Sequence, residues 1–225
     1  GHTDQVIARH VTGYHAATEG VRAAAPLSMS QPHAAGALVS TVDDLFGWSR
    51  ALHTGKVLTA ESYRRMITPE GKAGEPPNGY GLGVAIGSLR GRTLIEHGGG
   101  INGFVSILLY LPESDITVAV LRNADGEGSG AVTALAKSLA AYALGDPYPA
   151  RTPIDLPEED LAAVQGVYRQ GDEGPTRTLR LVDGVLTSQR TGGRPFPLQP
   201  IGTDTFAFVD SLSYLRIERD ATGAP

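Results

Sequence analysis

The segment from Leu94 to Phe104 constrains this chain most, because it places one histidine and four glycines between two apolar runs. Ile95 before the glycines and Val105–Leu111 after them are typical of β-strands. Glycine weakens a strand unless a ligand or another backbone must come close to it. The pattern therefore predicts a binding edge around His97. A glycine-rich hairpin that carries an incidental histidine is the alternative.

Four β runs joined by short connections surround this segment. They cover residues 80–86, 92–96, 104–111 and 116–121, with the glycine stretch joining the second run to the third. Sequential strands with short connections favour an antiparallel meander. Helical patterns precede and follow these runs. The fold class predicted for residues 1–145 is therefore α+β, an antiparallel sheet flanked by helices.

Three helices are predicted around the sheet. The first is capped by a hydroxyl or carboxylate within residues 40–44 and ends at Gly55, the second runs from Thr59 to Pro69, and the third spans Ala131–Leu144. Apolar spacing gives the first helix a face of Leu45, Trp48, Ser49 and Leu52, and the third a face of Val132, Leu135, Leu139 and Tyr142. Trp48 and Tyr63 are interpreted as core residues rather than substrate platforms.

The other segments of this first domain are predicted to be irregular. Residues 1–35 are expected to form a loop with one short extended segment between Val6 and Tyr14, and residues 70–78 and 123–130 are expected to be loops. A Pro-rich linker follows at residues 146–157.

Residues 158–225 are predicted to form a small antiparallel β-barrel, which is expected to be truncated. Six short β runs lie at residues 164–169, 178–182, 185–190, 196–200, 205–209 and 214–218. Asp183-Gly184 is a strong two-residue hairpin signal. Residues 219–223 have the composition of another turn, and no return strand follows it.

Composition excludes several classes of function. A net charge of −5 and a pI near 5.7 argue against binding to nucleic acid or to an anionic membrane surface. The absence of cysteine excludes disulfides, thiolate metal sites and cysteine nucleophiles. No apolar run is long enough to span a membrane. The remaining histidines lack metal-site spacing, so no metal is predicted; they are His2, His10, His15, His33 and His53.

Three segments, taken in order, carry a family resemblance: residues 36–45 (GALVSTVDDL), residues 80–83 (YGLG), and residues 97–104 (HGGGINGF). Together they resemble the C-terminal half of the serine β-lactamase-like family, which includes class C β-lactamases, D-alanyl-D-alanine carboxypeptidases and related esterases. The resemblance covers residues 1 to about 145. The segment after the linker resembles the lipocalin-like domain that some members append. The resemblance implies a periplasmic or secreted protein without a cofactor.

The resemblance also implies acyl transfer on a small-molecule or peptide substrate: a β-lactam, a D-alanyl peptide or an ester. In this family the serine of an S-x-x-K motif attacks the carbonyl, and the lysine and a Y-x-N tyrosine handle protons. His97-Gly98-Gly99 matches the H-x-G triplet of the family's edge strand, and the next N–H, of Gly100, would enter the oxyanion hole. His97 and Gly100 are thus the predicted catalytic residues, and Gly98 and Gly99 the predicted substrate-binding residues. A strand-end histidine bonded to the backbone is the alternative for His97.

The nucleophile motifs are missing from these 225 residues. None of the three lysines has a serine three places before it, and no Y-x-N or S-x-N occurs. Lys72-Ala73-Gly74 copies the K-T-G form, but it lies in a Pro/Gly loop and is interpreted as a solvated lysine. The chain is therefore expected to be an inactive fragment whose partner is the upstream segment carrying S-x-x-K and Y-x-N. We also expect apolar surface near His97 that is exposed or covered by a partner.

Two other hypotheses about the function of the chain remain open. In one, the chain is a non-catalytic module whose glycine edge accepts a peptide strand. In the other, which rests on fold analogy alone, the C-terminal β domain carries small apolar ligands.

Overall fold

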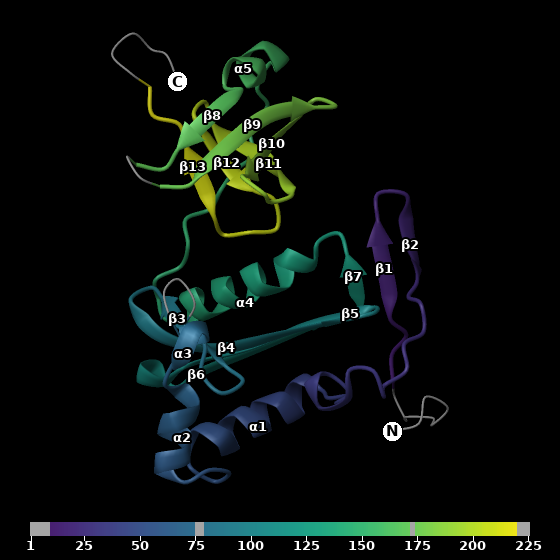
Figure 1. The fold of residues 1–225 in the computed structure, drawn as a ribbon, viewed down its shortest axis with the longest axis vertical. Coiled ribbons are helices and arrows are strands. Elements are labelled where there is room, and N and C mark those ends of the chain that lie inside the picture. Colours follow the sequence, from purple (N-terminus) through teal and green to yellow (C-terminus); the bar gives the residue numbers. More distant parts are fainter. Residues whose placement is uncertain (1–9, 75–78, 172–173, 220–225) are drawn as a thin grey trace. The chain divides into compact units, whose positions relative to one another are not determined.

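The chain divides into two compact units, Gly1–Tyr148 and Pro149–Pro225, drawn in Figure 1. The computed structural model describes residues 10–74, 79–171 and 174–219. The boundary between the units falls inside the Pro-rich segment 146–157. No helix in the described ranges is long and apolar enough to cross a membrane.

The first unit is built on a four-stranded antiparallel sheet in the order β3-β4-β5-β6. Its strands are β3 (Ala85–Leu89), β4 (Arg92–Ile101), β5 (Phe104–Leu111) and β6 (Ile116–Arg122). Each strand pairs with the next one along the chain. The predicted meander is therefore confirmed, and with it the α+β class.

Two strand boundaries differ from the prediction. β3 begins at Ala85 rather than at residue 80, because residues 79–84 form a turn against the end of α2 (Ala60–Ile67). In this turn the Leu82 N–H donates to the Met66 carbonyl at 2.9 Å, and a Cβ at Gly81 would lie 2.1 Å from the same oxygen. β4 continues through the glycines, so the connection to β5 is only the two residues 102–103.

The predicted starts of the first two helices are confirmed, whereas the third begins at Ser129 rather than at Ala131. α1 (Val42–His53) begins after Thr41, whose hydroxyl accepts from the Asp44 N–H at 3.1 Å. α2 begins after Thr59, whose hydroxyl accepts from the Ser62 N–H at 3.2 Å. Each cap satisfies an N–H that the helix itself leaves free. Short 3₁₀ turns lie at His33–Ala35 and Pro112–Ser114.

Helices lie on both faces of the sheet (Figure 1). α4 (Ser129–Ala143) packs on the face that buries Ile107, Leu109 and Leu111 of β5. α1 packs on the other face, where the His53 ring stacks on Tyr110 at 4.0 Å between centroids. Burial lowers the pKa of His53 from 6.5 to about 4, so this imidazole is neutral near pH 7.

Two predictions about helix faces are wrong. The side of α4 that meets the sheet consists of small residues, namely Val132, Ala136, Ala140 and Ala141. Leu135, Leu139 and Tyr142 are instead 50%, 47% and 76% exposed. Both sides of this helix are apolar, so spacing alone could not identify the buried one; alanine allows the helix axis to come close to the sheet. Trp48 on α1 is 51% exposed rather than core, whereas Tyr63 is half-buried.

Three segments predicted to be irregular contain regular structure. The N-terminal region forms a hairpin of β1 (Tyr14–Ala17) and β2 (Gly20–Ala23), and β7 (Ala124–Gly126) pairs in parallel with β1. Gly71–Gly74 forms the one-turn helix α3. These elements escaped prediction because they are only three or four residues long, and β7 also depends on a partner strand 110 positions away. Residues 1–9 and 75–78 of the predicted segments lie outside the described residues.

The second unit is a six-stranded antiparallel sheet that curls into a half-barrel, which confirms the predicted architecture. After α5 (Glu158–Ala163) come β8 (Gly166–Arg169), β9 (Thr176–Val182), β10 (Val185–Arg190), β11 (Pro195–Gly202), β12 (Thr205–Phe208) and β13 (Tyr214–Arg216). Phe206 lies at the centre of its core with no exposed surface. Asp183 and Gly184 join β9 to β10 with φ of +50° and +77°, as a type I′ hairpin requires. Residues 220–223 of the predicted final turn lie outside the described residues.

Candidate active site

The second half of β4 forms a free sheet edge. β3 pairs with β4 only from Arg92 to Glu96, while β5 pairs with it along the whole stretch to Ile101. Within the described ranges, no strand lies on the β3 side of residues 97–101. His97 and the three glycines after it are exposed. The four predicted site residues are therefore brought together on one accessible edge.

The hairpin register decides which backbone groups point outward from this edge. Ile101 and Phe104 flank the two-residue turn, so they exchange hydrogen bonds with each other. Hydrogen-bonded and non-hydrogen-bonded pairs alternate along an antiparallel ladder. The N–H and C=O groups of Gly98 and Gly100 therefore point away from β5, toward the free edge. Two N–H donors roughly 7 Å apart along the strand are available to an extended ligand.

The glycines at this edge differ in what a side chain would meet. A Cβ at Gly99 would lie 2.6 Å from the Ser106 hydroxyl of β5, whereas a Cβ at Gly100 would meet no described atom within 4 Å. A side chain at position 99 would therefore require the Ser106 hydroxyl to move. Packing does not require glycine at position 100, where its small size keeps the edge open.

Among the described residues the His97 ring has one hydrogen-bond partner, the Tyr80 hydroxyl, which lies 2.8 Å from Nε2. The two rings meet edge to face, with centroids 6.0 Å apart. A backbone partner for this ring, which is the alternative for His97, does not occur among the described residues. Glu96, one position earlier, faces α4 and accepts from the Lys137 ammonium at 2.8 Å. The alternation of a strand separates these two residues onto opposite faces.

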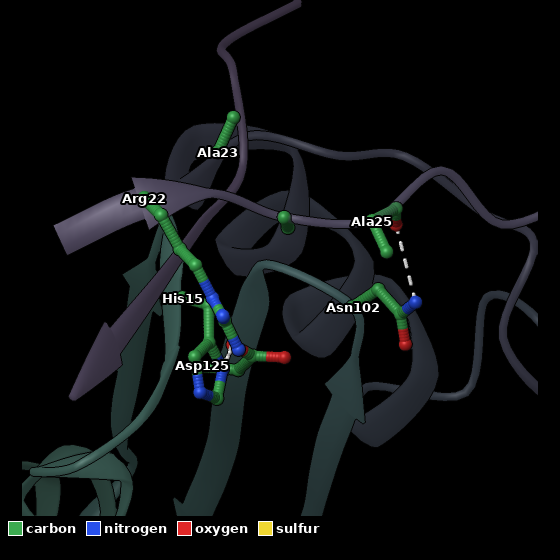
Figure 2. A pocket seen from close by; sticks show the side chains of 7 residues that line it. His15, Arg22, Ala23, Ala25, Asn102 and Asp125 are labelled. Atoms are coloured by element: carbon green, nitrogen blue, oxygen red, sulfur yellow. Dashed lines mark hydrogen bonds and ion pairs between the residues drawn. The ribbon is translucent and has the colours of Figure 1, made fainter.

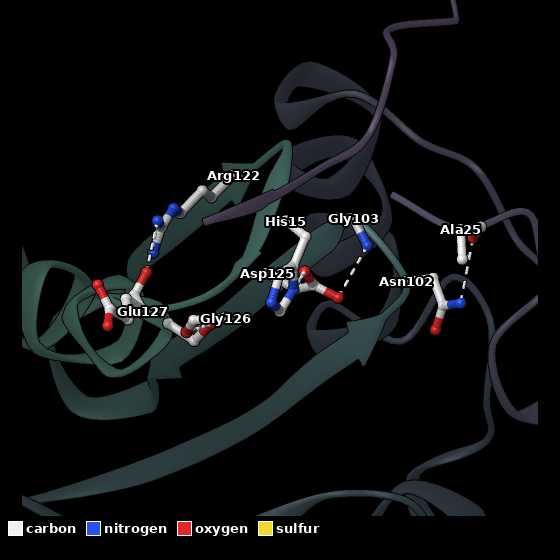
Figure 3. Close-up of polar contacts among 9 residues, drawn as sticks. His15, Ala25, Asn102, Gly103, Arg122, Asp125, Gly126 and Glu127 are labelled. Atoms are coloured by element: carbon white, nitrogen blue, oxygen red, sulfur yellow. Dashed lines mark hydrogen bonds and ion pairs between the residues drawn. The ribbon is translucent and has the colours of Figure 1, made fainter. Parts of the chain in front are cut away.

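A polar network lies at the turn end of this edge (Figures 2 and 3). Asp125 bonds the His15 Nδ1 through one oxygen at 2.7 Å and accepts from the Gly103 N–H through the other at 3.0 Å. Asn102 donates to the Ala25 carbonyl at 3.1 Å. Asp125 thereby joins the β4–β5 turn to the N-terminal hairpin. The backbone N–H of Gly103, followed by His15, holds the pKa of the Asp125 carboxyl below its usual value of 3.8.

An open pocket of about 530 Å³ lies beside this network, two residues beyond Gly100 (Figure 2). Asp125, His15 and Arg22 stand in one row across β7, β1 and β2, because His15 pairs with both of the others. They line the pocket together with residues 23–25 and Asn102. The free edge therefore ends beside a pocket that is lined by both polar side chains and alanines.

Asp125→Asn is expected to destabilise the first unit by about 1.5–3 kcal/mol at pH 7, the range for hydrogen bonds to a charged group. Because folding lowers the pKa of this carboxyl, its stabilisation is complete above pH 3.8 and is lost as the pH falls through the folded-state value. Urea unfolding from pH 2 to 7 measures this dependence. The variant should show a smaller loss on acidification, and the exposed Asp155→Asn should behave as wild type. Equal acid sensitivity of both variants would contradict this role.

Sequence reasoning identified the edge and missed the residues that support it. Tyr80 lies in a segment predicted to be a strand, and His15 and Asp125 lie in segments predicted to be loops. No local spacing connects them to His97 or Gly103, because the contacts span 17 to 110 positions. In the described ranges, no group of three or more His, Cys, Asp or Glu side chains is placed to hold a metal ion.

The free edge, its outward N–H groups and the histidine before them are consistent with the resemblance noted in the sequence. The model of the Beta-lactamase family matches residues 1–142. The chain belongs to this family. The appended lipocalin-like domain remains a prediction, since the match ends before the second unit.

Curated relatives of this β-lactamase-family chain are D-aminopeptidases. The D-aminopeptidase of Gluconobacter oxydans is 30% identical over 137 residues, which are 61% of this chain and 25% of that protein. The one from Brucella canis is 27% identical over 130 residues, 57% of this chain and 24% of that protein. The chain thus spans about a quarter of the length of these relatives.

A solved structure resembles both units. The octameric penicillin-binding protein homologue from Pyrococcus abyssi is 26% identical and has a TM-score of 0.55. The similarity covers 88% of this chain and 46% of that one. It therefore extends beyond the 142 residues of the family match.

Proposed function

We propose that this chain is part of a serine hydrolase that cleaves amide or ester bonds by acyl transfer. The observation that carries the proposal is the free edge of β4, which directs the Gly100 N–H outward, three residues after His97. An N–H at this position suits an oxyanion hole, which stabilises the negative charge that develops on the carbonyl oxygen. His97 would donate a hydrogen bond to the substrate or to a neighbouring hydroxyl, and Gly98 and Gly99 would let the substrate lie along the strand.

The nucleophile would come from polypeptide outside these 225 residues. Family membership together with the missing S-x-x-K and Y-x-N motifs supports this part of the proposal. Exposed apolar side chains support it as well: Phe46 and Trp48 on α1 are 53% and 51% exposed, and Leu135 and Leu139 on α4 are about half exposed. Contact with further polypeptide would bury these side chains.

Among the possible substrates, the relatives favour an amide. The two relatives described above are named D-aminopeptidases. We therefore place peptides or amides of D-amino acids ahead of β-lactams and simple esters as substrates.

Labelling with a fluorescent penicillin and with a fluorophosphonate probe tests the proposal. The 225-residue chain alone should show no covalent label, because it has no activated serine. Co-expression with its natural upstream segment should restore labelling and turnover of a D-amino-acid amide. Stoichiometric labelling of a serine in the isolated chain would refute the missing nucleophile, and an unlabelled, inactive complex would refute the hydrolase.

The same edge favours one other function, a module that binds an extended peptide without cleaving it. The outward N–H and C=O groups of Gly98 and Gly100 would pair with such a peptide as an added strand. Peptide binding by the co-expressed complex, without turnover, would support this function instead.

A further inference from the structure

Tyr80 is held by a backbone arrangement in which neither neighbour tolerates a side chain. A Cβ at Gly79 would lie 2.2 Å from the Ile86 carbonyl oxygen, and one at Gly81 would lie 2.1 Å from the Met66 carbonyl oxygen. The Ile86 N–H also donates to the Gly79 carbonyl at 2.6 Å. Both contacts are with backbone, which cannot rotate aside as a flexible side chain can. The turn therefore sets the direction from which the Tyr80 hydroxyl approaches β4.

That hydroxyl meets only one nitrogen of the His97 ring. It lies 2.8 Å from Nε2, while Nδ1 has no hydrogen-bond partner in the described part of the chain. A phenol is a better donor than acceptor, and the unprotonated nitrogen of a neutral imidazole is a strong acceptor. The favoured arrangement is thus O–H donating to Nε2. In neutral histidine, the hydrogen bond made by one nitrogen decides which nitrogen carries the proton.

We propose that Tyr80 is a positioning residue that fixes neutral His97 as the Nδ1–H tautomer. Free histidine in water prefers the proton on Nε2, so Tyr80 reverses the ordinary preference. His97 then keeps an unused N–H donor at Nδ1, while its ring is fixed through Nε2. The consequence for catalysis rests on the proposed function: the donor available for a substrate or a neighbouring hydroxyl is Nδ1–H.

Nitrogen NMR of the 225-residue chain, labelled with ¹⁵N-histidine and observed at a pH where imidazoles are neutral, tests this directly. His97→Gln identifies the His97 signals by their loss. In the wild-type chain, Nδ1 should be the protonated nitrogen and Nε2 the unprotonated one. Tyr80→Phe removes the hydroxyl and keeps the ring, and it should return His97 to the Nε2–H form. Tyr142→Phe, which changes an exposed tyrosine of α4, should leave the His97 signals unchanged.

A wild-type His97 that carries its proton on Nε2 would overturn the proposal without any variant. An unchanged tautomer in Tyr80→Phe would overturn it as well, provided that the β4 amide signals show an intact sheet. In the complex with the upstream segment, Tyr80→Phe should lower kcat about five- to tenfold, the effect of one lost hydrogen bond. The NMR measurement needs no turnover, so an inactive complex would count against the proposed function and leave the tautomer assignment intact.

Discussion

Gly100→Pro is expected to lower kcat about 10²- to 10³-fold in the complex with the upstream segment, the cost of one lost oxyanion-hole donor. Proline removes the N–H of residue 100, and this N–H points away from β5. The sheet should therefore remain folded, since proline is tolerated where a strand edge is unpaired. Steady-state kinetics on a D-amino-acid amide, together with circular dichroism, measure both effects.

Two matched variants separate the N–H from other effects of the substitution. Gly100→Ala keeps the N–H, and its Cβ would meet no described atom within 4 Å, so its kcat should stay within a few-fold of wild type. Gly99→Pro removes an N–H from the hydrogen-bonded pair with Ser106 and should destabilise the sheet itself. Equal losses of kcat in the alanine and proline variants at position 100 would show that the N–H is not the donor.

Leu109→Ala is expected to lower the free energy of unfolding of the first unit by about 2–5 kcal/mol, the range for truncating a buried leucine. Leu109 has no exposed surface and lies in the core between the sheet and α4. Its strand partner on β4 is Glu96, next to His97. Loss of this side chain therefore weakens the layer that supports the candidate site. Urea unfolding monitored by circular dichroism measures the change.

The control for this substitution is Leu121→Ala on β6, the outer strand of the same sheet. Leu121 is 41% exposed, so truncation should change stability by less than about 1 kcal/mol. A loss at Leu121 equal to that at Leu109 would mean that the Leu121 side chain is buried in solution.

Much of the fold follows from local residue patterns. The capped starts of α1 and α2, the meander and the Asp183-Gly184 hairpin each depend on residues adjacent in sequence. Such patterns failed where two faces of one element are equally apolar, as with Leu135 and its neighbours on α4. They failed again where elements are three or four residues long, as with β1, β2 and β7.

The candidate site also combines features that local sequence predicts with features that depend on long-range packing. His97 and the three glycines that follow it form a motif that can be recognised in the sequence, because its residues are consecutive and lie on one strand. Long-range packing decided how that edge is used. β3 ends its pairing at Glu96, which frees the outward groups of Gly98 and Gly100. The Tyr80 hydroxyl contacts His97, 17 positions away in sequence, because Gly79 and Gly81 shape the turn that holds Tyr80. Local sequence patterns could not predict this contact, because it depends on the tertiary structure.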